Sequence, residues 1–144
     1  VIGCVEVALD SFSPGDKFKI SAAYADAAPS FTGATNVPIS GPVGPVGGNF
    51  AGDSWNVLAS FIHYWQPNLN SSITASYVEY EGSFSSAYDV EAWKVAFDTA
   101  YKPVQNLTLL GEIGYQDVDA GVGYGPGADV DGFFGLVRLQ RDFP

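Results

Sequence analysis

The sequence predicts an all-β chain that folds as an antiparallel meander of about seven strands. Three observations support this fold class. Apolar and polar residues alternate with period two in separate segments along the whole chain, which is a strand pattern and not a helix pattern. Turns rich in Pro, Gly and Asn separate several of these segments. Aromatic residues make up 15% of the 144 residues and Gly contributes 17, a composition typical of strands joined by glycine-rich turns.

The first two predicted strands are joined by a Pro-Gly turn. Alternation runs from Val1 to Leu9, and SFSPGD at residues 11–16 forms the turn. The second strand covers residues 17–26, and its lysines and Ser21 oppose a face of Phe18, Ile20, Ala22 and Tyr24. An aperiodic segment rich in Gly, Pro and Ser follows at residues 27–52 and is expected to be a surface loop, which at this length is usually functional or disordered.

Four further strands are predicted in the middle of the chain, at residues 53–65, 71–81, 90–101 and 107–116. The turns QPNLN at residues 66–70 and KPVQN at 102–106 are tight, whereas residues 82–89 and 117–129 form longer loops. The second of these loops contains GVGYGPG at residues 121–127. It does not open a helix after a strand, so it is expected to be a flexible loop and not a phosphate-binding loop.

The last predicted strand, Val130 to Phe143, separates apolar from polar side chains most clearly. Phe133, Val137 and Leu139 fall on one side, and Arg138, Gln140 and Asp142 on the other. A tilted strand of about 9–11 residues crosses a bilayer. The apolar side could then meet lipid and the polar side water, although a closing strand of a soluble β-sandwich would show the same alternation.

The lengths of the connections favour a barrel. Short turns all fall at the end of the meander that holds Phe143, and the longer loops all fall at the opposite end. This is the arrangement of outer-membrane barrels, and Greek-key sandwiches do not sort their loops in this way. Acidic residues concentrate at the long-loop end, where a solvated face is the simplest interpretation.

Composition also excludes several functions. The net charge is −10 with only 6 Lys and Arg residues, too few for a surface that follows nucleic-acid phosphates. The single cysteine, Cys4, excludes an intramolecular disulfide and a cysteine-cluster metal site. No run of about 18 apolar residues could form a transmembrane helix. Residues 1–144 are predicted to form one β-barrel segment, and no cofactor is predicted.

Two groups of residues contain side chains of the types used in catalysis. Asp98 and Glu112 share a face on neighbouring strands and could act as a glycosidase-type pair of carboxylates. A non-catalytic role explains these two carboxylates better: they would be charges on the inner wall of a barrel, balanced by Lys94 and Arg138 on the same face. His63 is the only histidine, so neither a zinc site nor a Ser–His–Asp triad finds support. The chain is predicted to have no catalytic and no metal-binding residues.

Several motifs resemble general porins of alphaproteobacteria, the rhizobial and brucella-type porin family. They are FIHYWQP at residues 61–67 followed by 71–77, the strand 93–101 with its turn at 103–107, RLQRDF at 138–143, and Gly15-Asp16 before 18–24. The resemblance spans nearly the whole chain in order. It implies the outer membrane of a Gram-negative bacterium and a 16-stranded barrel, usually trimeric, of which these residues would be the C-terminal part.

The resemblance implies a water-filled channel for passive diffusion of small hydrophilic solutes and ions. The predicted pore-lining residues are Glu6, Lys17, Lys19, Lys94, Asp98, Glu112 and Arg138. Expected partners are outer-membrane lipid, lipopolysaccharide, the solutes, and either two further copies in a homotrimer or the remaining barrel strands. The alternative is a soluble up-and-down β-barrel of the lipocalin type, which would turn its aromatic face inward around an apolar ligand.

Overall fold

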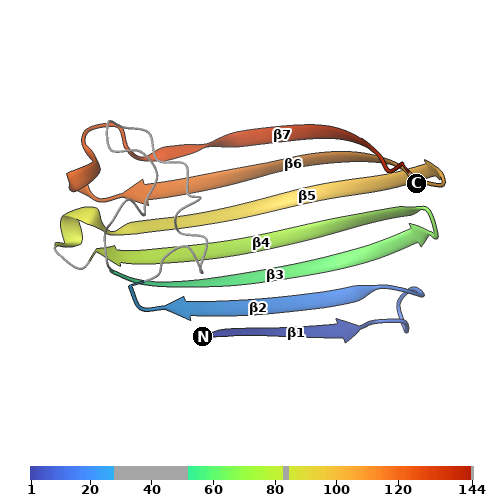
Figure 1. Ribbon diagram of the computed structural model, residues 1–144, viewed down its shortest axis with the longest axis horizontal. Coiled ribbons are helices and arrows are strands. Elements are labelled where there is room, and N and C mark those ends of the chain that lie inside the picture. The colour runs from blue at the N-terminus through green and yellow to red at the C-terminus, as the bar shows by residue number, and fades with distance from the viewer. Residues whose placement is uncertain (28–51, 83–84, 144) are drawn as a thin grey trace.

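The computed structural model describes residues 1–27, 52–82 and 85–143, which form one antiparallel sheet with its strands in chain order (Figure 1). The strands are β1 Ile2–Ala8, β2 Lys17–Ala25, β3 Gly52–Gln66, β4 Leu69–Gly82, β5 Val90–Val104, β6 Leu107–Ala120 and β7 Val130–Arg141. Each strand pairs with its sequence neighbours. The predicted all-β, seven-stranded meander is confirmed.

The four central strands, β3 to β6, are longer than the sequence pattern predicted, whereas β1, β2 and β7 are one or two residues shorter. β5 continues to Val104 and β6 to Ala120, so they include residues assigned to a turn and to a loop. Ala120 still pairs with Val90, and Val118 with Ala92, in the ladder between these strands. Asp117 and Asp119 give this stretch of the sequence the composition of a loop. Val118 and Ala120, however, continue the period-two alternation of the strand. The predicted loop 27–52 lies outside the described residues, except for Ala27 and for Gly52, which begins β3.

The connections separate the two ends of the sheet. The turns from β1 to β2, β3 to β4 and β5 to β6 lie at the same end as the C-terminus, called here the short-turn end (Figure 1). The other end, the long-loop end, carries two short 3₁₀ helices, η3 Ser86–Tyr88 and η4 Val122–Tyr124. In the described ranges, no helix has the length and apolar character needed to cross a membrane.

Most buried apolar side chains of the described residues lie at one end of the sheet, and Ala96 is the exception at mid-strand. The buried cluster consists of Tyr80, Val90, Val118, Ala120, Tyr124 and Ala128, all at the long-loop end. Along the strands, by contrast, many large apolar side chains are exposed, with Val137 at 89% and Ile113 at 67%. A contiguous apolar surface of this kind needs an apolar neighbour, either lipid or protein.

Candidate functional site

All seven predicted pore-lining residues lie on one face of the sheet, called here the polar face. Strand pairing sets this result, because directly paired residues point to the same side and alternate residues along a strand do too. Glu6 pairs with Lys19, and Asp98 with Glu112. The register places the remaining three, Lys17, Lys94 and Arg138, on the same side as these residues.

Most of the charge on the polar face lies in a narrow belt at mid-strand. One row of paired residues runs from Glu6 and Lys19 across the sheet to Gly114 and Phe134. The adjacent row on the short-turn side holds Lys17, Asp98 and Glu112, and the row on the long-loop side holds Lys94. This charged belt therefore contains three basic and three acidic side chains, and only Arg138 among the predicted residues lies outside it.

At the β1–β2 side of the belt, one carboxylate binds two lysines. Glu6 Oε1 lies 3.0 Å from Lys17 Nζ, and Glu6 Oε2 lies 2.9 Å from Lys19 Nζ. Each of the three side chains is about 40% exposed, so the pairs are accessible to water and contribute little stability. Their arrangement places one unit of net positive charge at this side of the belt.

At the β5–β7 side, Lys94 lies between an acidic and an aromatic side chain. Its Nζ is 3.3 Å from Glu112 Oε1 and 4.3 Å from the centroid of the Phe134 ring. The ring covers Gly114 on the paired strand, where an added Cβ would lie 2.3 Å from Phe134. Phe134 therefore fills the space left by a glycine and gives the ammonium group a cation–π contact.

Asp98 and Glu112 are paired residues, but each carboxylate has its own partner. The Ser72 hydroxyl donates a hydrogen bond to Asp98, and Glu112 forms the ion pair with Lys94. Arg138 lies further toward the short-turn end on β7, where its Nη2 donates to Gln140 Oε1 at 2.6 Å. The structure thus brings six of the seven predicted residues together and leaves Arg138 apart, in a polar ladder along β7.

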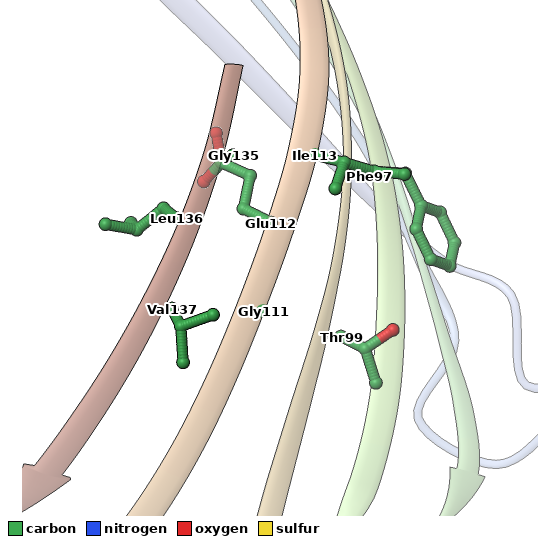
Figure 2. Close-up of a pocket in the computed structure, with 8 residues that line it drawn as sticks. All are labelled: Phe97, Thr99, Gly111, Glu112, Ile113, Gly135, Leu136 and Val137. Atoms are coloured by element: carbon green, nitrogen blue, oxygen red, sulfur yellow. The ribbon is translucent and has the colours of Figure 1, made fainter. Parts of the chain in front are cut away.

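The opposite face of the sheet, called the apolar face, carries aliphatic and aromatic side chains at mid-strand. Figure 2 shows Phe97 and Ile113 on this face, with Glu112 and Leu136 directed to the other side of the strands. Gly111 and Gly135 have no side chains to fill the surface, and a shallow groove of about 430 Å³ lies over them. No charged side chain of β5 to β7 enters the middle of this face.

A row of aromatic side chains borders the apolar face toward the long-loop end. Trp55 and Tyr77 rings lie 5.1 Å apart, Trp93 and Tyr115 5.4 Å, and Tyr115 and Phe133 5.0 Å. Carboxylates on the same face bind polar atoms of these and neighbouring aromatic residues: Glu79 lies directly opposite Trp55, whereas Asp53 and Asp131 lie one step nearer the loops than Tyr24 and Tyr115. Tyr24 donates to Asp53 at 2.9 Å, Trp55 to Glu79 at 3.0 Å and Tyr115 to Asp131 at 3.0 Å.

A second aromatic pair, Trp65 and Tyr101, lies on the same face near the short-turn end. Trp65 Nε1 donates to the Ser71 hydroxyl at 3.1 Å. The stretch of β5 from Trp93 to Tyr101 is roughly 26 Å long at about 3.3 Å per residue. At a strand tilt of about 40° this corresponds to roughly 20 Å across a bilayer, close to the apolar band of about 25 Å found on outer-membrane barrels.

His63 belongs to a structural contact that the sequence did not predict. Its Nδ1 lies 2.8 Å from Asp16 Oδ2, and the backbone N–H of Tyr64 donates to Asp16 Oδ1 at 2.8 Å. Asp16 is fully buried. Burial alone would raise the pKa of this carboxyl, but the hydrogen bonds from His63 and Tyr64 outweigh burial and hold the pKa below its ordinary value. The residues around His63 form a clamp between the β1–β2 turn and β3.

No group of three or more His, Cys, Asp and Glu residues in the described part of the chain is arranged to hold a metal ion. Cys4 is exposed on the polar face as a free thiol. Asp16 could not have been singled out from the sequence, because PGD is an ordinary turn and His63 lies 47 residues away. The contacts between aromatic side chains and carboxylates could have been predicted, because aromatic and acidic residues alternate in the sequence near the strand ends.

An antiparallel meander with a charged face, and with an apolar face between two groups of aromatic residues, is the architecture of a transmembrane β-barrel wall. A family model for a porin subfamily matches residues 3–129, and the chain belongs to this family of bacterial outer-membrane β-channel proteins. Neither a curated protein nor a solved structure matches the chain. Membership in the family agrees with the resemblance inferred from the motifs.

Proposed function

We propose that the chain forms part of the wall of a water-filled outer-membrane channel through which small hydrophilic solutes and ions diffuse passively. The observation that supports this function best is the opposite character of the two faces. The polar face carries the charged belt and the hydroxyl groups of Ser60 and Thr74, which are hydrogen-bonded at 3.0 Å. The apolar face carries the side chains suited to lipid.

A soluble barrel around an apolar ligand fits these exposures less well. Such a barrel would bury its aromatic face, yet Trp93, Phe97 and Phe133 are 42%, 48% and 89% exposed. The aromatic side chains of the apolar face are thus not enclosed by the described strands, which favours the channel.

The charged belt would act on solutes through its field. Its acidic and basic groups lie at the same height on different strands, so a solute that passes along the wall meets a transverse field. Lys94 and Arg138 would attract anions and repel cations over about 8–10 Å at moderate salt. Asp98 and Glu112 carry the opposite charge, and their separate partners favour this role over joint catalysis.

A complete channel needs more strands than those described. β1 and β7 form the two edges of the sheet and have one neighbour each within the described residues. Open edges do not persist in lipid, because each unpaired backbone group costs several kcal/mol there. We infer that strands from elsewhere in the polypeptide or from other subunits close the barrel, with 16 strands and a trimer as the resemblance implies. Outer-membrane lipid and lipopolysaccharide would surround it.

The proposal is tested with a complete barrel containing these strands, reconstituted in planar bilayers under a salt gradient. Replacing both Lys94 and Arg138 with Gln should shift the reversal potential toward cation selectivity without abolishing conductance. The matched control is Arg141→Gln, because Arg141 lies on the apolar-face side of β7. A double variant with an unchanged reversal potential would contradict the assignment of these two residues to the conducting path.

A further inference from the structure

Two loops at the long-loop end pack on the polar face of the sheet. The buried strand residues Tyr80, Val90, Val118 and Ala120 follow the same register as Lys94, and the loop residues Tyr124 and Ala128 pack against them. Tyr124 and Ala128 are each only 2% exposed. The segments 85–89 and 121–129 thus cover the end of the face that carries the charged belt. We call these two segments the ledge.

Contacts between the two segments fix the ledge. The Tyr88 and Tyr124 rings meet edge to face with centroids 5.7 Å apart, and the Tyr124 hydroxyl donates to the Tyr88 carbonyl at 3.3 Å. The Gly121 N–H donates to the Asp89 carbonyl at 2.8 Å. Burial raises the pKa of Tyr124 to about 12, so this hydroxyl remains a hydrogen-bond donor at physiological pH.

Glycine permits the close approach of the two segments. A Cβ on Gly121 would lie 2.4 Å from the Ala87 carbonyl oxygen, and one on Gly123 would lie 2.6 Å from the Tyr88 ring. No side chain fits at these positions without moving the backbone. The segment GVGYGPG, expected from the sequence to be a flexible loop, is therefore a packed element. Gly121 and Gly123 allow the close contact, and Gly125 and Gly127 adopt the positive φ angles of 94° and 80°.

Hydrogen bonds also attach the ledge to the strand ends. The Asp89 carboxylate accepts from the Gly82 N–H at 2.8 Å, and the Asp129 carboxylate accepts from the Ala120 N–H at 2.9 Å. From Val90, beneath the ledge, to Lys94 in the belt is roughly 13 Å of strand at about 3.3 Å per residue. The ledge and the charged belt are therefore separate features of the same face.

We propose that the ledge narrows the mouth of the channel at the long-loop end and limits the size of the solutes that enter. This inference rests on the proposed channel function, because it needs the polar face to line the lumen. The ledge adds bulk over the wall, and its two carboxylates are bound to backbone N–H groups. Entry is then selected by size at the ledge, and ions are selected by charge at the belt.

The test measures the size cut-off of the complete barrel in planar bilayers, with polyethylene glycols of increasing size added at the long-loop side. Gly121→Val should force the two segments apart, and Tyr124→Ala should remove the side chain that holds them. Both variants should shift the cut-off to larger polymers and leave the reversal potential unchanged. Val122→Ala is the matched control, because Val122 is 86% exposed in the same segment and its truncation should leave the cut-off unchanged.

A second measurement does not depend on loosening the ledge. In a Cys4→Ser background, a cysteine introduced by Val122→Cys is coupled to a thiol-reactive polyethylene glycol, which should reduce the single-channel current. The same coupling after Val137→Cys, on the apolar face, should leave the current unchanged. If the barrel conducts but its current is unchanged by the polymer coupled at position 122, the proposed narrowing by the ledge is wrong and the channel function is unaffected. A wild-type barrel without any conductance would refute the channel function itself.

Discussion

At the scale of single residues, adjacent positions on one strand face opposite surroundings. Val95 is on the apolar face and Lys94 is on the polar face of β5. Val95→Arg should destabilise the barrel by roughly 2–4 kcal/mol, because a charged group at mid-bilayer loses its hydration. The free energy of unfolding in lipid vesicles, measured by urea titration with tryptophan fluorescence, checks this value. A harmless Val95→Arg together with a Lys94→Leu that abolishes folding would reverse the two faces.

The ionisation of Asp16 makes the stability of the folded protein depend on pH. Because its pKa is lowered in the folded protein, the contribution of the carboxylate to stability is complete above the ordinary value of 3.8 and is lost as the pH falls through the lowered value. Asp16→Asn should lower the unfolding midpoint at neutral pH. As the pH falls below 3.8, the variant should also lose less stability than the wild type does.

The measurement is urea unfolding of the complete barrel in detergent micelles at a series of pH values. Asp10→Asn serves as the control, because its carboxylate accepts from Gly15 in the same turn but is exposed. If wild type and Asp16→Asn lose stability in parallel as the pH falls, the clamp to His63 and Tyr64 does not carry this dependence.

At the scale of the elements, acidic residues lie directly opposite one another near the long-loop end of the apolar face. Glu91 on β5 pairs with Glu79 on β4 and with Asp119 on β6. Like charges in opposed positions destabilise a sheet, so Glu91→Gln should stabilise the barrel by about 0.2–1 kcal/mol. The gain should shrink at high salt, because Glu91 and Asp119 are exposed and the repulsion between them is screened.

Urea titration at low and high salt checks this prediction, and Glu6→Gln is the matched comparison. Glu6 pairs with Lys19 and forms ion pairs with Lys17 and Lys19, so its neutralisation brings no relief of repulsion. Equal responses of the two variants would show that the opposed pairs at the loop end do not repel each other measurably.

The elements also show what the sequence could and could not predict. Period-two alternation locates all seven strands and assigns residues such as Lys94 and Val95 to opposite faces, because side-chain direction follows directly from strand geometry. Contacts at the strand ends do not follow from any period. The Asp16–His63 clamp and the contact between Tyr88 and Tyr124 join residues far apart in the chain, and only the sheet register brings them together.

At the scale of the whole molecule, each part of the sheet has a place in a membrane channel. The aromatic groups lie at the two borders of the apolar face, the charged belt lies at mid-strand on the opposite face, and the ledge covers the long-loop end of that face. The sequence predicted the belt residues from parity, and the structure brings six of them into three adjacent rows. Arg138 was predicted by the same parity but lies apart, because parity fixes the face and not the height along the strand.

The central claim is that the polar face meets water and the apolar face meets lipid. In a complete barrel with Cys4→Ser, cysteines are introduced separately by Glu112→Cys and Ile113→Cys, neighbours on β6 with opposite directions. The rate of modification by a charged, membrane-impermeant thiosulfonate reagent is measured through the channel current in planar bilayers. The cysteine at 112 should react and change the current, and the one at 113 should not. Reaction at 113 with protection at 112 would contradict the account.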